Sequence, residues 1–419
     1  MLRFLSTGES HGQALIAVVD GFPAGVPVNI EQLNKELQRR QQGYGRGSRQ
    51  KIESDSAELL SGVRHGTTTG APITFMIKNR DFENWQYVMS SSPVDTSTPE
   101  AQAQFEKKKI GRFRPGHADL GGTIKYRQKD IRDVLERASA RETASRVAAG
   151  ALCEQLLAHL GVEMASHVIS VGPIASSLKT DELKLSDLRQ KVEESEMFCG
   201  DENATEKMKE FIKKAWQDGD SVGGVVEVVA AGLPVGLGSY TQWEEKLDGQ
   251  IAQALMSIQA MKAVEIGDGV NSASLPGSQV HDALYPNDIP GQLPFTRSTN
   301  HAGGIEGGMT NGSPLRVRAY MKPIPTLRKG LESLSFPEFE AQTAHYERSD
   351  VCAVPAASVV AKAMVAIVLA RAILKKFGSD TLEEIKDAVE RHRAWCNELP
   401  KRGRAESSDI EETPEMEQE

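Results

Sequence analysis

Residues 356–377 read AASVVAKAMVAIVLARAILKKF, the most strongly apolar segment of this 419-residue chain. Apolar side chains occupy every side of the helix that this stretch predicts, and a helix of that kind is normally buried in a protein core. Its longest uninterrupted apolar run, residues 363–370, is too short to span a membrane and is flanked by Lys362 and Arg371. We therefore expect a protein without a membrane span, with this helix in its core.

The rest of the chain mixes strand patterns with helical ones. We expect strands at 15–19, 73–77, 167–171, 225–229 and 315–320. We expect helices at 30–41, at about 129–160, and from a capping box at Asp380 and Glu383 to about Cys396. Residues 91–108, rich in Ser, Pro and Gln, predict a surface loop. This mixture predicts an α+β fold.

Three short patterns recur in the same order and indicate an internal repeat. Gly-x-Pro-x-Gly occurs at 21–25 and 232–236, Gly-x-Thr-x-Gly-x-Pro at 66–72 and 308–314, and Glu-Arg at 136–137 and 347–348. Matches of Gly and Pro alone also arise by chance, which is the alternative. A real repeat predicts a duplicated α+β unit with a pseudo-twofold axis and halves at about 1–162 and 163–400. A site between the halves would then draw residues from both.

The negative charge of the chain is concentrated at its end. The net charge is −9, and residues 405–419 contain seven acids and no base. The remainder is nearly neutral, which argues against a broad nucleic-acid-binding face. We expect a single catalytic domain over residues 1–400 and a disordered acidic tail over 401–419.

Cysteine usage indicates a reducing compartment. The cysteines at positions 153, 199, 352 and 396 are scattered, without a CxxC pair. This pattern argues against a disulfide framework and against a zinc or other metal site. Glu9 and His11 precede any long apolar run, so we identify no secretory signal and expect a cytoplasmic protein.

Residues 111–146 gather positive charge around one histidine. The stretch GRFRPGHADLGGTIKYRQKDIRDVLERASARETASR contains nine Arg or Lys residues and His117. A Pro-Gly turn presents His117, with Arg114 beside it and Asp119 able to orient the ring or the backbone. Guanidinium groups beside an imidazole suit a substrate with several anionic groups and a step that needs a proton donor. The alternative is a turn histidine that only bonds the backbone.

Two glycine-containing segments in the first half could contact a ligand. Gly8-Glu9-Ser10-His11-Gly12 places a histidine in a tight loop, either reaching a ligand or bonded to backbone. Residues 39–51 (RRQQGYGRGSRQK) carry five cations, three glycines and no acid, which suits either an anion or a solvated basic loop. The GxxxxGK[ST] spacing of a phosphate-binding loop is absent.

Further along the chain, three more segments carry candidate residues. Arg137 and Arg141 are four residues apart and would share a helix face, with surface pairing to Glu136 or Glu142 as the alternative. Residues 300–308 (NHAGGIEGG) would let the backbone approach a flat or phosphorylated ligand closely. Asp350, after Arg348, would be an ion-pair partner, a base or an orienting group.

Together these motifs resemble those of the chorismate synthase family. GESHG, RRQQGYGRGSR, SGVRHGTTTGAPI, RPGHAD, ERASARET, NHAGGIEGGMTNG, MKPIPTL and ERSD-x-CAVPA occur here in that family's order, over about residues 1–400. The resemblance implies a β-α-β sandwich and a homotetramer. It also implies a lyase that converts 5-enolpyruvylshikimate 3-phosphate to chorismate and phosphate by 1,4-anti elimination. That reaction is the last common step of aromatic amino acid biosynthesis in the shikimate pathway, and it needs reduced FMN without net redox change.

The resemblance also implies a role for particular residues. His117 would protonate the departing phosphate, and His11 would protonate reduced flavin or balance its charge. Asp350 would assist proton transfer at flavin N5, and Ser10 would support this network. The substrate anions would be held by Arg49, Arg114, Arg141 and Arg348, with Arg40 and Arg46 at the entrance, where NADP is also assigned. Flavin contacts would come from Arg137, Ala138, Ser139, Gln259, Ala260, Gly307, Lys322, Pro323, Ile324, Pro325, Thr326 and Arg348.

Two other functions stay open at this point. A non-catalytic protein that binds flavin or a phosphorylated ligand would need neither His11 nor His117. An enolpyruvyl transferase acting on related polyanions would need no flavin. Because no segment resembles an added reductase domain, we expect reduced FMN to come from an external flavin reductase, with NADPH as the alternative direct reductant.

Overall fold

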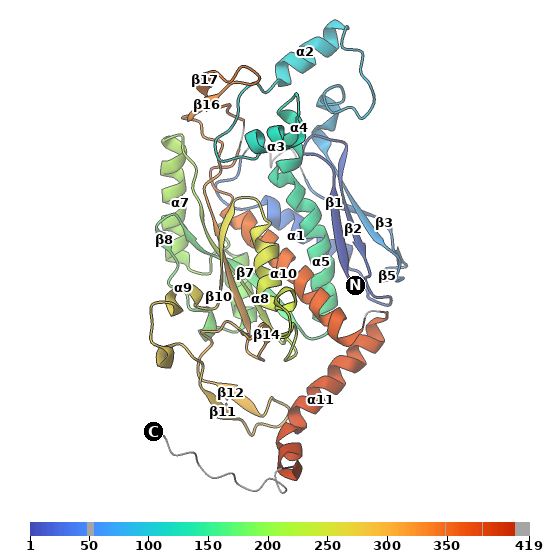
Figure 1. Ribbon diagram of the computed structural model, residues 1–419, viewed down its shortest axis with the longest axis vertical. Coiled ribbons are helices and arrows are strands. Elements are labelled where there is room, and N and C mark those ends of the chain that lie inside the picture. Colours follow the sequence, from blue (N-terminus) through green and yellow to red (C-terminus); the bar gives the residue numbers. More distant parts are fainter. Residues whose placement is uncertain (48–53, 348, 379, 407–419) are drawn as a thin grey trace.

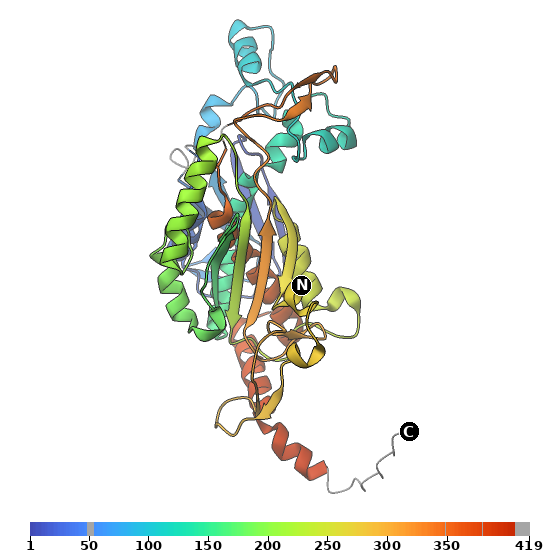
Figure 2. The same cartoon turned by 90° about the vertical axis from the view of Figure 1, so that its left-hand side faces the viewer.

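The computed structural model describes residues 1–47, 54–347, 349–378 and 380–406. Two antiparallel β-sheets enclose a layer of helices, which gives a β-α-β sandwich (Figures 1 and 2). The expected α+β class is therefore confirmed.

The first sheet is built from the N-terminal part of the chain. Its strand order is β1-β2-β6-β3, with all neighbours antiparallel. The bounds are Arg3–Thr7 (β1), Ala14–Asp20 (β2), Ala57–Ser61 (β3) and Ile73–Lys78 (β6). Leu15, Ala17 and Val19 of β2 are buried while the residues between them are partly exposed, as expected for a sheet with one face against the core.

The second sheet has the order β10-β15-β9-β7-β8, again antiparallel. Its strands are Glu163–Val171 (β7), Ile174–Ala175 (β8), Gly224–Ala231 (β9), Met261–Ile266 (β10) and Leu315–Met321 (β15). All five strands expected from the sequence are thus present in the two sheets, each extended by one to four residues.

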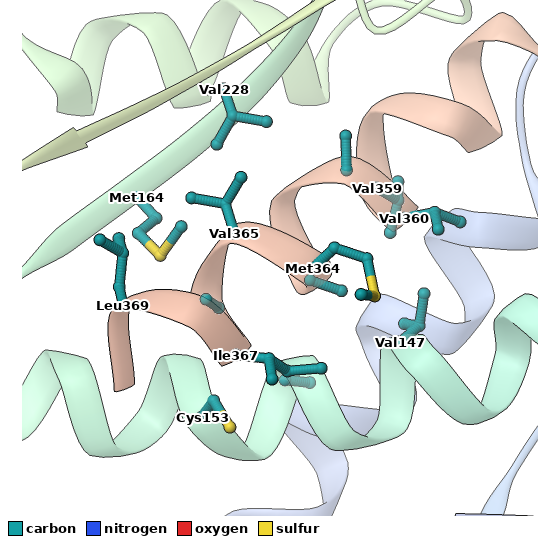
Figure 3. Close-up of a cluster of buried hydrophobic side chains, with 14 of the residues drawn as sticks. Val147, Cys153, Met164, Val228, Val359, Val360, Met364, Val365, Ile367 and Leu369 are labelled. Carbon is teal, nitrogen blue, oxygen red and sulfur yellow. The ribbon is translucent and has the colours of Figure 1, made fainter. Parts of the chain in front are cut away.

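Four helices fill the space between the sheets: Ile30–Gln41 (α1), Thr143–His159 (α5), Leu247–Met256 (α8) and Val354–Phe377 (α10). The segment expected to form the core helix is α10, which begins two residues earlier than predicted. It packs against α5 on one side and against β7 and β9 on the other. Figure 3 shows this contact, with Val359, Val365 and Leu369 of α10 among the buried side chains.

The remaining elements lie around this sandwich. Four short hairpins are Val63–Arg64 with Thr67–Thr68 (β4, β5), Leu284–Pro286 with Phe295–Arg297 (β11, β12), Ile305–Glu306 with Met309–Thr310 (β13, β14), and Glu332–Leu334 with Ala341–Thr343 (β16, β17). The other helices are Pro99–Lys108 (α2), Asp119–Tyr126 (α3), Arg132–Ala138 (α4), Leu185–Glu193 (α6), Glu202–Gln217 (α7), Gly269–Ser272 (α9) and Leu382–Glu406 (α11).

The expected single helix over 129–160 is wrong. It is divided into α4, a 3-10 turn at Ala140–Glu142, and α5. Ser139 causes the break, because its backbone is extended (φ −62°, ψ 140°) and its hydroxyl accepts a hydrogen bond from the N–H of Arg141. Apolar spacing continues through this point, so periodicity could not reveal it.

Three smaller predictions also need correction. Residues 99–108 of the expected surface loop form α2. The last helix is capped one residue later than expected, since Thr381 accepts from the N–H of Glu384 and donates to its carboxylate. That helix, α11, continues beyond Cys396 to Glu406, so 401–406 of the expected tail are helical. Residues 407–419 lie outside the described part of the chain.

The repeated sequence patterns make matching hydrogen bonds. Thr68 donates to the carbonyl of Pro23 and accepts from the N–H of Val26, at 2.6 and 2.9 Å. Thr310 makes the same two bonds with Pro234 and Leu237, at 2.6 and 2.8 Å. The strand orders β1-β2-β6-β3 and β7-β9-β15-β10 also match in chain sequence. These correspondences support a duplicated unit, whose pseudo-twofold axis stays a prediction.

One helix, α10, has the length and hydropathy of a membrane span. However, 94% of its most apolar 18-residue window is buried inside the protein. Its apolar character is accounted for by its position between the two sheets.

The contact between α5 and α10 predicts the effect of a single methyl group. A Cβ atom on Gly150 would lie 2.4 Å from the Cβ of Ala363 and 2.6 Å from its carbonyl oxygen. We expect Gly150→Ala to lower the free energy of unfolding by about 1–3 kcal/mol, measured by urea denaturation, because two backbones must move apart. Gly121→Ala, at a helical glycine with open space around it, is the control and should be neutral or stabilising. Equal stability of the Gly150 variant and the parent would contradict the close-packing argument.

Candidate functional site

A cavity of about 520 Å³ lies where the N-terminal ends of both central helices meet the loops of the two halves. This volume is within the usual range of small-molecule sites. Thr143 of α5 and Ala356 and Ala357 of α10 line it, so two helix N-termini with their partial positive charge face the cavity. The site therefore favours anionic ligands before any charged side chain is considered.

His117 is held on this cavity by a buried carboxylate. Its Nδ1 lies 2.6 Å from Oδ1 of Asp119, which can only accept, so Nδ1 carries the proton of a neutral ring. Nη2 of Arg114 lies 3.0 Å from Nδ1 and 3.3 Å from Nε2, so the unprotonated Nε2 of that ring faces a group that can only donate. Arg114 donates to both oxygens of Asp119, at 2.8 and 3.0 Å. Burial alone would raise the pKa of Asp119, but the hydrogen bonds from His117 and Arg114 lower it well below its ordinary value.

His11 has a similar arrangement on the other side of the cavity. Its Nδ1 lies 2.8 Å from Oε1 of Glu136, and its backbone N–H donates to Oε2 of the same carboxylate. The imidazole stacks on Trp85 with ring centroids 3.9 Å apart. Burial would raise the pKa of Glu136, but bonding to His11 and the charge of Arg132 lower it overall. Of the two alternatives for the GESHG loop, the structure favours a histidine that reaches the cavity.

Two of the expected substrate arginines share one carboxylate. Arg40 and Arg141 each donate to Asp55 at 2.5 Å, one to each oxygen. Arg141 also donates to the side chain of Asn79. Arg40 is only 4% exposed, so it is buried in the wall of the cavity rather than set at an entrance.

Asp350 is fixed by the loop that precedes residue 48. Its oxygens accept from the Arg46 guanidinium at 2.5 Å and from the backbone N–H of Gly47 at 2.6 Å. All three residues line the cavity. Arg49 and Arg348, two further expected anion ligands, lie outside the described residues.

The second half of the chain forms the opposite wall. Most of its expected flavin contacts, Gln259, Ala260, Lys322, Ile324, Pro325 and Thr326, line the cavity. Lys322 donates to the carbonyl of Gly116 at 2.6 Å and so joins this wall to the turn that presents His117. Ser10, Ala138 and Ser139 line the first-half wall, where the two serine hydroxyls bond each other at 3.0 Å.

Three expected contact residues are not part of this cavity. Arg137 is exposed and donates instead to Ser6 and to the carbonyl of Gly8. It does not share a face with Arg141 because the helix breaks at Ser139 between them. Pro323 is absent from the lining, and Gly307 lies in the β13–β14 turn, which precedes β15, whereas Lys322 follows that strand.

Sequence reasoning missed several side chains that shape the site. Asp55 and Asn79 were not singled out, because each gains its role from a partner at least 15 residues away. Glu136 was considered only as a surface partner of an arginine. Trp85 belongs to none of the motifs identified in the sequence, and no local pattern marks it as a neighbour of His11.

The lining residues fit a polyanionic substrate next to a flavin. Buried Nε–H groups of Arg40 and Arg46 have no acceptor among the described residues, and five cationic side chains line the cavity. Gln259 donates to Glu142, while its own buried carbonyl oxygen has no donor within the described chain, which suits an N–H or hydroxyl group of a ligand. Ile258, Leu135 and Val360 provide apolar surface for a flat ring.

Comparison with known proteins gave consistent results. The family model described as chorismate synthase matches residues 2–374. Chorismate synthase from Brevibacillus brevis is 50% identical over 398 residues, covering 95% of this chain and all of the relative, and that from Shouchella clausii is 52% identical with the same coverage. A crystal structure of chorismate synthase aligns with a TM-score of 0.75 and 40% identity, over 94% of this chain and 98% of that one.

The shared carboxylate predicts a specific pH dependence. Burial would raise the pKa of Asp55, but Arg40 and Arg141 lower it below its ordinary value of 3.8. A depressed pKa in the folded state means that ionised Asp55 stabilises the fold above about pH 4, and that this contribution is lost as the pH falls further. We expect Asp55→Asn to cost about 3–5 kcal/mol of unfolding free energy at pH 7, since two buried guanidinium groups lose their partner.

The difference between parent and variant should therefore shrink below pH 4, as measured by urea denaturation at pH 7, 5, 4 and 3. The exposed Asp20, changed to Asn, is the control and should stay within about 0.5 kcal/mol of the parent. A constant difference from pH 7 to pH 3 would argue against the ion-pair account.

Proposed function

This chain belongs to the chorismate synthase family, a family of lyases of the shikimate pathway, and from that premise we propose its reaction. It converts 5-enolpyruvylshikimate 3-phosphate to chorismate and phosphate by a 1,4-anti elimination that requires reduced FMN. The observation that carries the proposal is the His117–Asp119–Arg114 cluster, which faces a cavity lined with cations.

The two carboxylates and the phosphate of this substrate account for the cationic lining. Arg114, Arg40, Arg46 and Arg141 would hold its anionic groups, and each charge-assisted hydrogen bond contributes roughly 1.5–3 kcal/mol. These side chains are already fixed by Asp119, Asp55 and Asp350. Little rearrangement is then needed at the moment of reaction, which is the condition for effective electrostatic stabilisation.

His117 supplies the proton for the leaving phosphate. Asp119 holds Nδ1, so the proton that is transferred would sit on Nε2 of the imidazolium, beside the Arg114 guanidinium at 3.3 Å. The ionised carboxylate stabilises the charged ring before transfer and keeps its orientation afterwards. The chain thereby provides a general acid whose position does not depend on the substrate.

The other histidine and Asp350 serve the cofactor side of the cavity. The C–H bond that breaks is too weakly acidic for a side-chain base, and reduced FMN supplies the electron-rich partner that this step needs. His11 would balance the charge of that cofactor or exchange a proton with it. Asp350, held by Arg46 and Gly47, would assist proton transfer beside it, and Ser10 would bond within this network.

The source of reduced flavin and the assembly belong to the same proposal. Gln259, Ala260, Lys322 and the segment after it would contact the flavin, with Arg40 and Arg46 as the positions for NADP. We propose a cytoplasmic homotetramer supplied by an external flavin reductase. Gly307 and Arg137 do not line the cavity of this chain. They would contact flavin only if their segments were arranged differently from the structure described above.

The proposal is tested by anaerobic turnover of 5-enolpyruvylshikimate 3-phosphate with chemically reduced FMN. Phosphate release and chorismate absorbance are followed together. Product only with reduced flavin supports the assignment, and product with FMN and NADPH alone would remove the need for a separate reductase. Turnover without flavin would favour the alternative of an enolpyruvyl transferase. If both flavin and substrate bind but no product forms, the alternative of a non-catalytic binding protein would be favoured.

Removal of the general acid gives the first prediction from this mechanism. We expect His117→Ala to lower kcat by about 10²- to 10⁴-fold, the usual contribution of a general acid, measured in the same anaerobic assay. His159→Ala, at an exposed histidine at the end of α5, is the control and should retain parental activity. A kcat for the His117 variant within a few-fold of the parent would make the assignment untenable.

A further inference from the structure

We infer that Glu136 is the positioning residue for His11, and that Trp85 and Arg132 hold this pair in place. The inference rests on the proposed function, since it concerns how the same cavity presents its second histidine. Glu136 itself does not line the cavity, so it acts through the imidazole and not on a ligand.

The contacts of Glu136 define one orientation of the ring. Its two oxygens lie 2.8 and 2.9 Å from Nδ1 of His11, and one of them also accepts the backbone N–H of His11. Because the carboxylate only accepts, a neutral ring must carry its proton on Nδ1. Nε2 has no hydrogen bond among the described residues and is left for the contents of the cavity.

A second set of contacts keeps the carboxylate and the ring from moving. Arg132 donates to Glu136 at 2.8 Å and lies over the Trp85 ring at 4.8 Å from its centroid. The Trp85 indole covers one face of His11, and its Nε1–H donates to Asp81 at 2.9 Å. The imidazole is therefore fixed both at its edge and on its face.

The same construction occurs at the other histidine of the cavity. His117, Asp119 and Arg114 repeat the order of imidazole, buried carboxylate and buried guanidinium. In both units the carboxylate is less than 3% exposed. In both units a carboxylate fixes Nδ1, but Nε2 of His117 also has the Arg114 guanidinium 3.3 Å away, whereas Nε2 of His11 has no such neighbour among the described residues.

Trp85 provides a readout of His11 that needs no substrate. A protonated imidazole stacked on an indole quenches its fluorescence, so the emission of Trp85 should change as His11 titrates. The other tryptophans, Trp216, Trp243 and Trp395, are at least 46% exposed and can be changed to Phe to leave Trp85 as the single emitter. His11→Asn in this background should abolish the pH-dependent change.

We expect Glu136→Gln to move the midpoint of this change to lower pH, because the negative charge that favours the imidazolium is lost. Other charged groups near the ring are the same in both proteins. These are Arg40, Arg46, Arg114, His117, Arg141, Lys322, Glu347 and Asp350 in the cavity, and Asp81, Lys108 and Arg132 around Trp85.

The matched control is a buried histidine–glutamate pair outside the site. Nε2 of His167 lies 3.0 Å from Glu227, and both side chains are inaccessible. Glu227→Gln removes a comparable carboxylate and should leave the Trp85 midpoint unchanged. Thermal unfolding at pH 7 confirms that each variant is folded before the titration is interpreted.

In the anaerobic assay, we expect Glu136→Gln to lower kcat at least about 10-fold and to shift its pH profile, with KM changed less than kcat. A folded variant whose Trp85 midpoint and pH profile match the parent would overturn the inference and leave the proposed reaction intact. A midpoint that is shifted in the Glu136→Gln variant, together with a parent protein that makes no chorismate, would uphold the positioning of His11 and refute the reaction instead.

Discussion

The close packing of α5 against α10 is the constraint on which the rest of the structure depends. The helices approach so closely at Gly150 and Ala363 that no side chain fits between them. Each helix can then cover the inner face of its own sheet, α5 that of β1, β2 and β6, and α10 that of β7 and β9. Because their N-terminal ends reach the same cavity, the packing that forms the core also brings two helix termini to one anion site.

The arginine side chains that line that cavity are paired with carboxylates. The sequence indicates a basic cluster, but Asp55, Asp119, Glu136 and Asp350 each pair with one or two of its arginines. A buried guanidinium without such a partner would be costly, and a surface arginine would be too mobile to orient a substrate. The carboxylates therefore explain how so many cations can be held inside the protein.

The sequence predicted the regular elements better than their interruptions. Hydrophobic periodicity predicted strands β2, β6, β7, β9 and β15 and helices α1 and α10. Each of these elements buries either one face or its whole surface. The break at Ser139 could not be predicted that way, since it depends on one extended residue within continuous apolar spacing. Similarly, the glycine-rich segment at 39–51 and the two histidine motifs contribute residues to the cavity, whereas the glycine-rich segment at 300–308 does not. Asp55, Trp85 and Glu136 are defined by contacts distant in sequence.

The proposed repeat explains why the cavity is assembled from segments so far apart. Glu136 and Glu347 each precede the first residue of the following core helix, α5 or α10, by seven positions, and residues near both of them line the cavity. The two halves nevertheless contribute different chemistry. The first supplies both histidines with their carboxylates, and the second supplies Asp350 and the wall from Lys322 to Thr326. Duplication of one scaffold followed by such divergence would place different side chains around the N-terminal ends of two equivalent helices.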